Sequence, residues 1–204
     1  MNLEALEIEL KKRWQLPYDW KGTKQTNELD LQTRFIYQIK SFDSLLQKIE
    51  SLSNPIQNYA LNRWYNFWSA TGVEYIFSQH SKVQPNKNSY DKLVDFTIDG
   101  ISFDHKTSVF PKGFSKTIQE AQNNPNELLH WLYDNQSSQG RQHFKNRLFL
   151  ILHHQNNDHW KLKAELKFLK NKIDNYVLNF DNQNLFTIEK NQQKIISDII
   201  WVIQ

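Results

Sequence analysis

Apolar and polar residues alternate over residues 92–106, near the middle of the chain. Asp99 and Gly100 interrupt this alternation, and the pair favours a two-residue type I′ turn because both central residues of that turn need positive φ. The pattern therefore predicts a β-hairpin. From the turn outward, its predicted register places Ile98 opposite Ile101, Thr97 opposite Ser102, Phe96 opposite Phe103 and Asp95 opposite Asp104.

Strand alternation sorts the side chains of this hairpin into an apolar face and a polar face. The expected polar face carries Asp95, Thr97, Ser102, Asp104 and Lys106. Like charges directly opposite each other destabilise a hairpin, so the predicted Asp95–Asp104 pair calls for a reason. Paired carboxylates suit a hard divalent cation, and a lysine beside them can contact a phosphate or activate water. The alternative is a solvated face with an Asp104–Lys106 ion pair of little consequence.

A helix is expected over residues 59–77, upstream of the hairpin. Phe67, Ala70, Glu74 and Phe77 have the spacing of one helix face. Glu74 thus interrupts an apolar stripe, where a carboxylate needs a partner. Either it lies at the edge of the stripe and pairs with a lysine, or it belongs to a site together with the hairpin acids.

The remaining pattern predicts helices on both sides of this region and further strands after it. We expect helices over residues 1–13, 29–53 and 161–178, and another that starts at Asn124-Pro125. The inner face of the 29–53 helix is expected to carry Leu31, Phe35, Ile39, Leu45, Leu46 and Ile49. The unbroken apolar run 148–152 predicts a strand buried on both faces, and two more strands are expected at 185–188 and 195–203. The fold class is therefore α/β, with a mixed central sheet flanked by helices.

In order along the chain come a helix glutamate, Glu74, then Asp95, then Asp104-x-Lys106, then a helix and an apolar strand. This order resembles the PD-(D/E)xK nuclease superfamily, whose fold is the restriction-endonuclease-like αβββαβ core. The match covers residues 57–153. Val94 replaces the proline of the family's name, and His105 stands where the family more often has a small or apolar residue.

By this resemblance, Asp95, Asp104 and Glu74 would bind Mg²⁺, with Mn²⁺ as a substitute. Lys106 would position or activate the attacking water. These four would be the catalytic residues of an endonuclease that hydrolyses phosphodiester bonds. We expect His105 to lie on the core side of the hairpin, where it is more readily explained as a hydrogen-bonded core histidine than as a ligand.

Composition and charge are compatible with a nucleic-acid partner but do not require one. The chain of 204 residues has a formal net charge of +3. Lys112 and Lys116 follow the hairpin, and Gln139 and Arg141 precede the apolar strand. These four residues are candidates for contacts to the nucleic acid. For each loop lysine taken singly, ordinary solvation is the better explanation.

Several classes of protein are excluded by what the sequence lacks. With 0 cysteines there is no disulfide framework, thiolate zinc site or cysteine nucleophile. No apolar run approaches the about 20 residues of a membrane span. The first ten residues form an acidic amphipathic pattern, unlike a signal peptide. We therefore expect a cytoplasmic protein with no membrane partner.

These observations predict a single nuclease-like domain. Its expected parts are a helical N-terminal extension (1–55), a catalytic core (57–153) and a C-terminal helix and strands (154–204). The predicted function is a Mg²⁺-dependent DNA endonuclease of the restriction or repair type. The alternatives are a non-catalytic module of the same fold that binds nucleic acid or protein, and an RNase. The sequence leaves a homodimer open.

Overall fold

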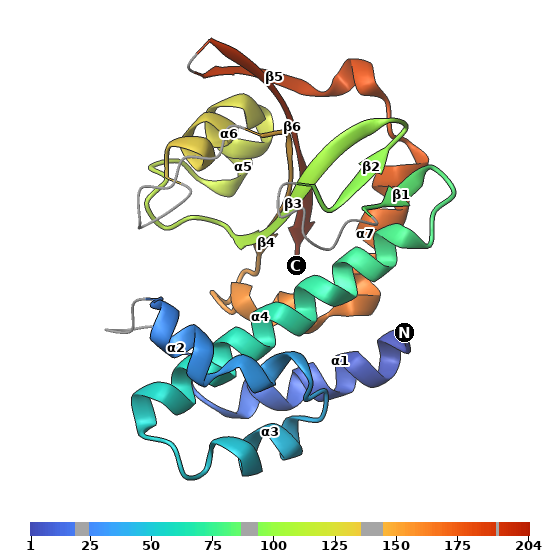
Figure 1. Cartoon of the computed structure of the whole chain (residues 1–204). Coiled ribbons are helices and arrows are strands. Elements are labelled where there is room, and N and C mark those ends of the chain that lie inside the picture. Colours follow the sequence, from blue (N-terminus) through green and yellow to red (C-terminus); the bar gives the residue numbers. More distant parts are fainter. Residues whose placement is uncertain (19–24, 87–93, 136–144, 191) are drawn as a thin grey trace. The chain divides into compact units, whose positions relative to one another are not determined.

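A computed structural model describes residues 1–18, 25–86, 94–135, 145–190 and 192–204 (Figure 1). The chain forms two compact units. The N-terminal unit comprises residues 1–75 and 163–169, and the sheet unit comprises residues 76–162 and 170–204. No helix of the described residues is both long enough and apolar enough to cross a membrane.

The N-terminal unit is helical. Its elements are α1 (Leu3–Lys12), η1 (Arg13–Gln15), α2 (Asn27–Gln32), η2 (Arg34–Tyr37), α3 (Phe42–Ile49) and most of α4 (Asn54–Ser78). The expected helices at 1–13 and 59–77 are confirmed, and α4 begins earlier than predicted. The predicted single helix over 29–53 is wrong, because three short elements take its place.

The break in that helix has a local cause. The Thr33 hydroxyl donates to the Leu29 carbonyl, and the side chain of Ser41 caps α3 by accepting from the backbone N–H of Ser44. Both side chains compete with a continuous helix for backbone groups. Leu31 is consequently 70% exposed, whereas Leu45 and Ile49 are buried as expected.

The sheet unit is built on six strands in the order β1-β2-β3-β4-β6-β5. The strands are β1 (Val83–Pro85), β2 (Phe96–Ile98), β3 (Ile101–Val109), β4 (Arg147–His153), β5 (Phe186–Lys190) and β6 (Gln193–Ile203). The first three pair antiparallel, β4 lies parallel to both β3 and β6, and β5 is antiparallel to β6. The sheet is therefore mixed, as the α/β prediction requires.

The predicted hairpin is confirmed for the three pairs nearest its turn, Ile98 with Ile101, Thr97 with Ser102 and Phe96 with Phe103. Asp99 has φ 46° and Gly100 has φ 84°, as a type I′ turn needs. The paired ladder ends at Phe96, whereas β3 continues to Val109 and pairs there with β4.

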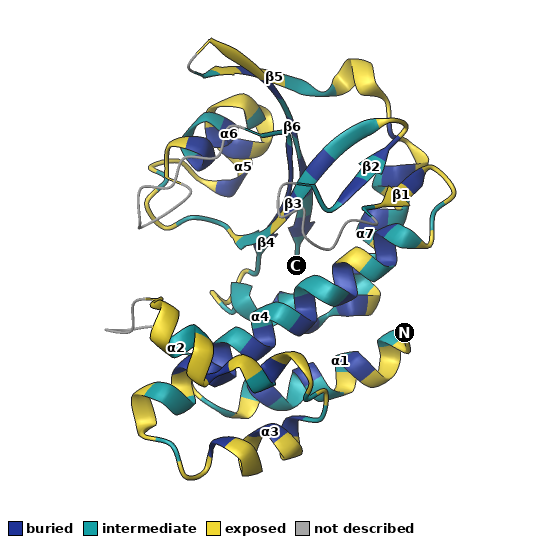
Figure 2. Ribbon diagram, in the orientation of Figure 1, coloured by how far each residue is buried: buried dark blue, intermediate teal, exposed yellow. Residues whose placement is uncertain are grey.

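Helices α5 (Ile118–Asn123) and α6 (Pro125–Asp134) cover one face of the sheet (Figures 1 and 2). A capping box between Thr117 and Glu120 starts α5, and Pro125 occupies the first turn of α6. Their inner residues form a core with the facing side chains of the strands: Ala121, Leu128, Leu129, Leu132, Tyr133, Phe149, Ile151, Ile188, Ile195 and Ile199. Because β4 is buried along nearly its whole length, the expectation for the 148–152 run is confirmed.

The opposite face of the sheet is packed by the end of α4 and by the part of α7 (Leu166–Leu178) that belongs to the sheet unit. Phe77 stacks on Phe96 with ring centroids 4.4 Å apart, and Phe103 meets Phe180 edge-on at 6.3 Å. The helix predicted over 161–178 is split into η3 (His159–Ala164) and α7, and η4 (Asn182–Asn184) precedes β5.

Candidate metal centre

Asp95 lies at a bend where the chain enters the hairpin. Its backbone N–H donates to the carbonyl of Phe103 over 2.8 Å, although Phe103 is already the ladder partner of Phe96. Two successive residues therefore oppose one residue of β3, which is the arrangement of a β-bulge. A bulge shifts the alternation by one residue, so the side chain of Asp95 turns to the face opposite the predicted one.

The side chain of Asp95 binds His105, not Asp104. The backbone N–H of His105 donates to Asp95 Oδ2 over 2.7 Å, and ring Nδ1 of His105 lies 2.9 Å from the same oxygen. The His105 side chain is only 4% exposed, and that of Asp95 is 31% exposed. The expectation of a buried, hydrogen-bonded His105 is thus confirmed, and its partner is the predicted metal ligand.

These contacts control the ionisation of Asp95. Burial raises the pKa of this carboxyl, but the hydrogen bonds and charge of His105, together with the charge of Lys106, act in the other direction. The net result is a pKa below the usual value for an aspartate. Asp95 is therefore a carboxylate at neutral pH, the form that a cation needs.

Asp104 does not join Asp95, and the prediction that these two carboxylates form one site is wrong. Asp104 Oδ2 accepts from Nε of Arg147 over 2.6 Å. Asp104 and Arg147 are partners in the parallel pairing of β3 and β4 and so point to the same face of the sheet. His105, the next residue, points to the other face. The bulge at Asp95 and the alternation of β3 thus separate the two acids.

Glu74 lies in α4, one turn before Phe77 on the same helix face. Helix α4 runs without a break through Glu74 and Phe77, and Phe77 stacks on Phe96. Glu74 is exposed, however, so the expectation that its carboxylate is buried or half-buried in an apolar stripe is wrong. An exposed carboxylate keeps its hydration and carries no cost of burial.

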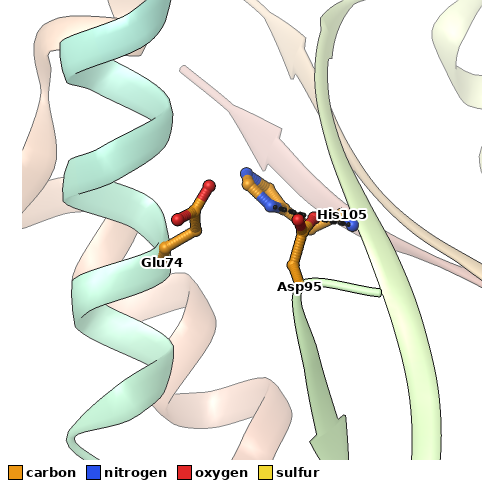
Figure 3. Close-up of side chains that lie close together, drawn as sticks. All are labelled: Glu74, Asp95 and His105. Carbon is orange, nitrogen blue, oxygen red and sulfur yellow. Dashed lines mark hydrogen bonds and ion pairs between the residues drawn. The ribbon is translucent and has the colours of Figure 1, made fainter. Parts of the chain in front are cut away.

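Glu74, Asp95 and His105 are the group among the described residues that could hold a metal ion, and their side chains are drawn in Figure 3. Two offer carboxylate oxygens and the third a ring nitrogen. Asp104 is outside this group. A group that could hold a metal ion is thus present, with a histidine in place of the second aspartate.

Lys106 is exposed on β3, and its charge is close enough to lower the pKa of Asp95. Alternation along β3 gives Lys106 and His105 opposite faces, and the charge of Lys106 acts on Asp95 from its own face. A lysine whose charge acts on a carboxylate can also attract a phosphate to the same region.

The predicted nucleic-acid contacts are divided between described and undescribed residues. Lys112 and Lys116 are both exposed after β3, and Lys116 forms an ion pair with Glu127 of α6. Gln139 and Arg141 lie outside the described residues.

His105 is the functional candidate that sequence reasoning assigned to the core. One signal could have found it: a histidine between Asp104 and Lys106 points to the side opposite both, where a bulged Asp95 can reach it. The hairpin register alone could not show this, because the bulge lies beyond the last pair that the turn determines.

Comparisons with known proteins add no family or relative to this geometry. No protein-family model, curated protein or solved structure matches the chain.

Proposed function

We propose that the protein is a metal-dependent phosphodiester hydrolase that acts on nucleic acid, as a DNA endonuclease of the restriction or repair type. The observation that carries this proposal is the ionised Asp95 bound to His105 at the end of the hairpin, where the charge of Lys106 also acts. Carboxylate, imidazole and ammonium groups together are the means by which proteins hold a cation next to a phosphate.

The order of the elements also supports the proposal. Helix α4 is followed by the antiparallel strands β1 to β3, then by α5 and α6, and then by β4 parallel to β3. This order resembles the αβββαβ core of the PD-(D/E)xK superfamily, in which the acids of the second and third strands and a helix glutamate serve hydrolysis. The departure is Asp104, whose carboxylate is taken by Arg147.

The donor set suits a divalent cation, Mg²⁺ or Mn²⁺. Asp95 Oδ2 accepts both hydrogen bonds from His105, and no described residue donates to Oδ1, which leaves that oxygen for a cation. Glu74 and His105 would supply the other ligands. When bound, the cation would polarise the scissile phosphate.

The remaining chemistry belongs to the chain itself. Lys106 would contact the phosphate and orient the attacking water, since its side chain is exposed and its charge acts on Asp95. Lys112, exposed in the segment after β3, would hold the polyanion by charge. Lys116 contributes less because Glu127 partly neutralises it.

The first experiment is cleavage of supercoiled plasmid with Mg²⁺ or Mn²⁺, compared with cleavage in EDTA. Wild-type protein should nick or linearise the plasmid only with metal. Asp95→Asn and Lys106→Ala should each lower the rate by about 100-fold or more, as loss of a general acid–base or charge-stabilising group does. Single-stranded DNA and RNA are tested alongside, and cleavage of RNA alone would assign an RNase.

The matched control is Asp99→Asn. Asp99 is an aspartate of the same hairpin, but it lies in the turn, where its carboxylate is 3.8 Å from Nζ of Lys82. Its substitution should leave cleavage unchanged. The hydrolase is excluded if wild-type protein cleaves none of the three substrates, or if Asp95→Asn is as active as Asp99→Asn.

A second function has one observation in its favour. Arg147 occupies Asp104, so one acid that the nuclease family uses is engaged in an internal ion pair. A non-catalytic module that binds nucleic acid or protein could tolerate that loss. Salt-dependent retention of the same plasmid in gel shifts, without cleavage under any metal condition, would select this function.

A further inference from the structure

The carboxyl ends of the parallel strands β3, β4 and β6 lie at one edge of the sheet. Just after β3, the backbone N–H of Phe110 donates to the carbonyl of Leu152 over 2.8 Å. Just after β6, the backbone N–H of Gln204 donates to the carbonyl of His153 over 3.0 Å. Ligands of α/β sheets bind outside the carboxyl ends of parallel strands, so the side chains gathered at this edge are candidates for a second site.

Three histidines gather at this edge: His153, His154 and His159, which we call the histidine cluster. The rings of His153 and His159 stack with centroids 4.9 Å apart, and Phe110 meets the ring of His153 edge-on at 5.8 Å. The backbone N–H of His154 donates to Nδ1 of His159 over 2.8 Å. The end of β4 and the segment that follows it therefore hold the rings of the cluster in fixed positions.

The bond to His159 also determines where the ring proton of this histidine lies. A backbone N–H can only donate, so Nδ1 of His159 carries a lone pair and the neutral ring is protonated on Nε2. Nδ1 of His154 accepts from the backbone N–H of Asn156 over 3.1 Å in the same way. No described residue accepts from Nε2 of His159, and this atom is not among the buried atoms that lack a partner. It is therefore an N–H donor that reaches solvent.

Positive charge predominates around His159. Burial lowers the pKa of His159, and so do the charges of the other two histidines and of Lys112. Asp158 acts in the other direction, but Nζ of Lys161 lies 2.9 Å from its carboxylate. Two lysines thus face one aspartate, and an anion bound here would offset the remaining positive charge.

We infer that the histidine cluster and Lys112 form an anion site that binds a phosphate group. Phosphate oxygens accept hydrogen bonds, so the N–H of His159 and the ammonium of Lys112 are complementary donors. The neutral ring can already donate, and protonation adds charge, so binding should strengthen as the pH falls. The inference goes beyond the proposed function, because this site does not include Asp95 or His105.

The test is NMR of ¹⁵N-labelled full-length protein in EDTA. It is titrated with inorganic phosphate and, separately, with single-stranded DNA that lacks terminal phosphates. The histidine ring spectra should show neutral His159 protonated on Nε2, and then a saturable shift of this signal with at least one probe. A shift with inorganic phosphate alone would assign a free or terminal phosphate, and a shift with the DNA would assign a backbone phosphodiester.

Lys112→Met and His159→Gln should each weaken binding by about 10-fold, as loss of a charge-assisted hydrogen bond does. One matched control is Lys194→Met, at an exposed lysine near the amino end of β6. The other is His80→Gln, at a histidine whose Nε2 lies 2.9 Å from Oδ1 of Asp174. Both controls should bind like wild type. Sulfate, whose own charge is constant in this range, should bind wild type at least about 5-fold more tightly at about pH 5.5 than at about pH 7.5.

Several results would overturn the inference. They are a neutral His159 protonated on Nδ1, no saturable shift with either probe, equal binding by Lys112→Met and Lys194→Met, or sulfate binding that ignores pH. Lys112 is exposed, so its variant decides the matter even if a thermal melt shows that His159→Gln fails to fold. Phosphate binding without cleavage would refute the hydrolase and keep this site, whereas cleavage without phosphate binding would refute this site alone.

Discussion

Asp104 and Arg147 form a largely buried ion pair in the sheet unit. The side chains are 19% and 7% exposed, respectively. A buried pair gains little over apolar residues, but loss of one partner leaves the other charge without compensation. The contribution of this pair to the free energy of unfolding is therefore seen only when one partner is removed.

Arg147→Met should destabilise the protein by about 3 kcal/mol, because the carboxylate of Asp104 would lose its partner in a poorly hydrated place. The double variant Arg147→Met/Asp104→Asn should recover part of that loss, which urea denaturation of the four proteins in the cycle would measure.

The control for this prediction is an exposed pair. Lys161 and Asp158 are 2.9 Å apart, with side chains 32% and 42% exposed. Lys161→Met should cost less than about 1 kcal/mol. An equal cost for the two substitutions, or no recovery in the double variant, would contradict a buried, coupled pair.

Asp95 shows where prediction of single residues stops. Alternation from the turn assigns faces correctly for Thr97 and Phe96, because each is paired in the ladder. The bulge reverses the next residue, and its cause, the bond to His105, is a contact between side chains that a periodicity cannot contain. Glu74 and Asp95 were therefore predictable as candidates, but the place of His105 in their group was not.

At the scale of elements, the predicted hairpin is confirmed and the predicted 29–53 helix is wrong. Local side-chain chemistry decided both outcomes. A two-residue turn leaves one register, so local chemistry determined the hairpin. In 29–53, apolar spacing favoured a helix, but Thr33 and Ser41 supplied competing caps. The Ser41 cap was visible in the sequence, whereas the exposure of Leu31 depends on tertiary packing.

Gly100→Ala tests the turn. Gly100 has φ 84°, and a Cβ there would meet no atom within 4 Å, so the cost is that of the backbone conformation alone. We expect a loss of about 1–2 kcal/mol in the free energy of unfolding, measured by urea denaturation. Asp99→Asn, which keeps a residue that tolerates positive φ, should be nearly neutral. Equal stability of Gly100→Ala and wild type would argue against the type I′ turn.

At the scale of the whole molecule, the N-terminal unit is completed by a segment from far along the chain. Residues 163–169 contribute the bond from Nζ of Lys163 to Asn66 and the ion pair of Glu165 with Lys11. Leu166 is fully buried within this unit, and its side chain would be 3.0 Å from a Cβ at Gly72. The division of the chain into these units was not expected from the sequence, since no composition change marks residues 163 and 169.

Leu166→Ala should therefore destabilise the protein by about 2–5 kcal/mol, as truncation of a buried leucine does. The control is Leu178→Ala, at a leucine of the same helix that is 68% exposed, which should change stability by less than about 0.5 kcal/mol. Thermal and urea denaturation followed by circular dichroism would compare them. Similar effects of the two substitutions would show that segment 163–169 does not hold the N-terminal unit together.

The position of β4 in the sheet has a consequence for biosynthesis. Its partner β3 precedes it in the chain, but β6 follows only after residues 154–192. At about 5–20 residues per second, translation leaves the far edge of this apolar strand without its partner for seconds. An uncovered apolar edge is a template for pairing with another nascent chain. The interval on the ribosome, more than the finished molecule, is then when this protein is most exposed to aggregation and most dependent on chaperones.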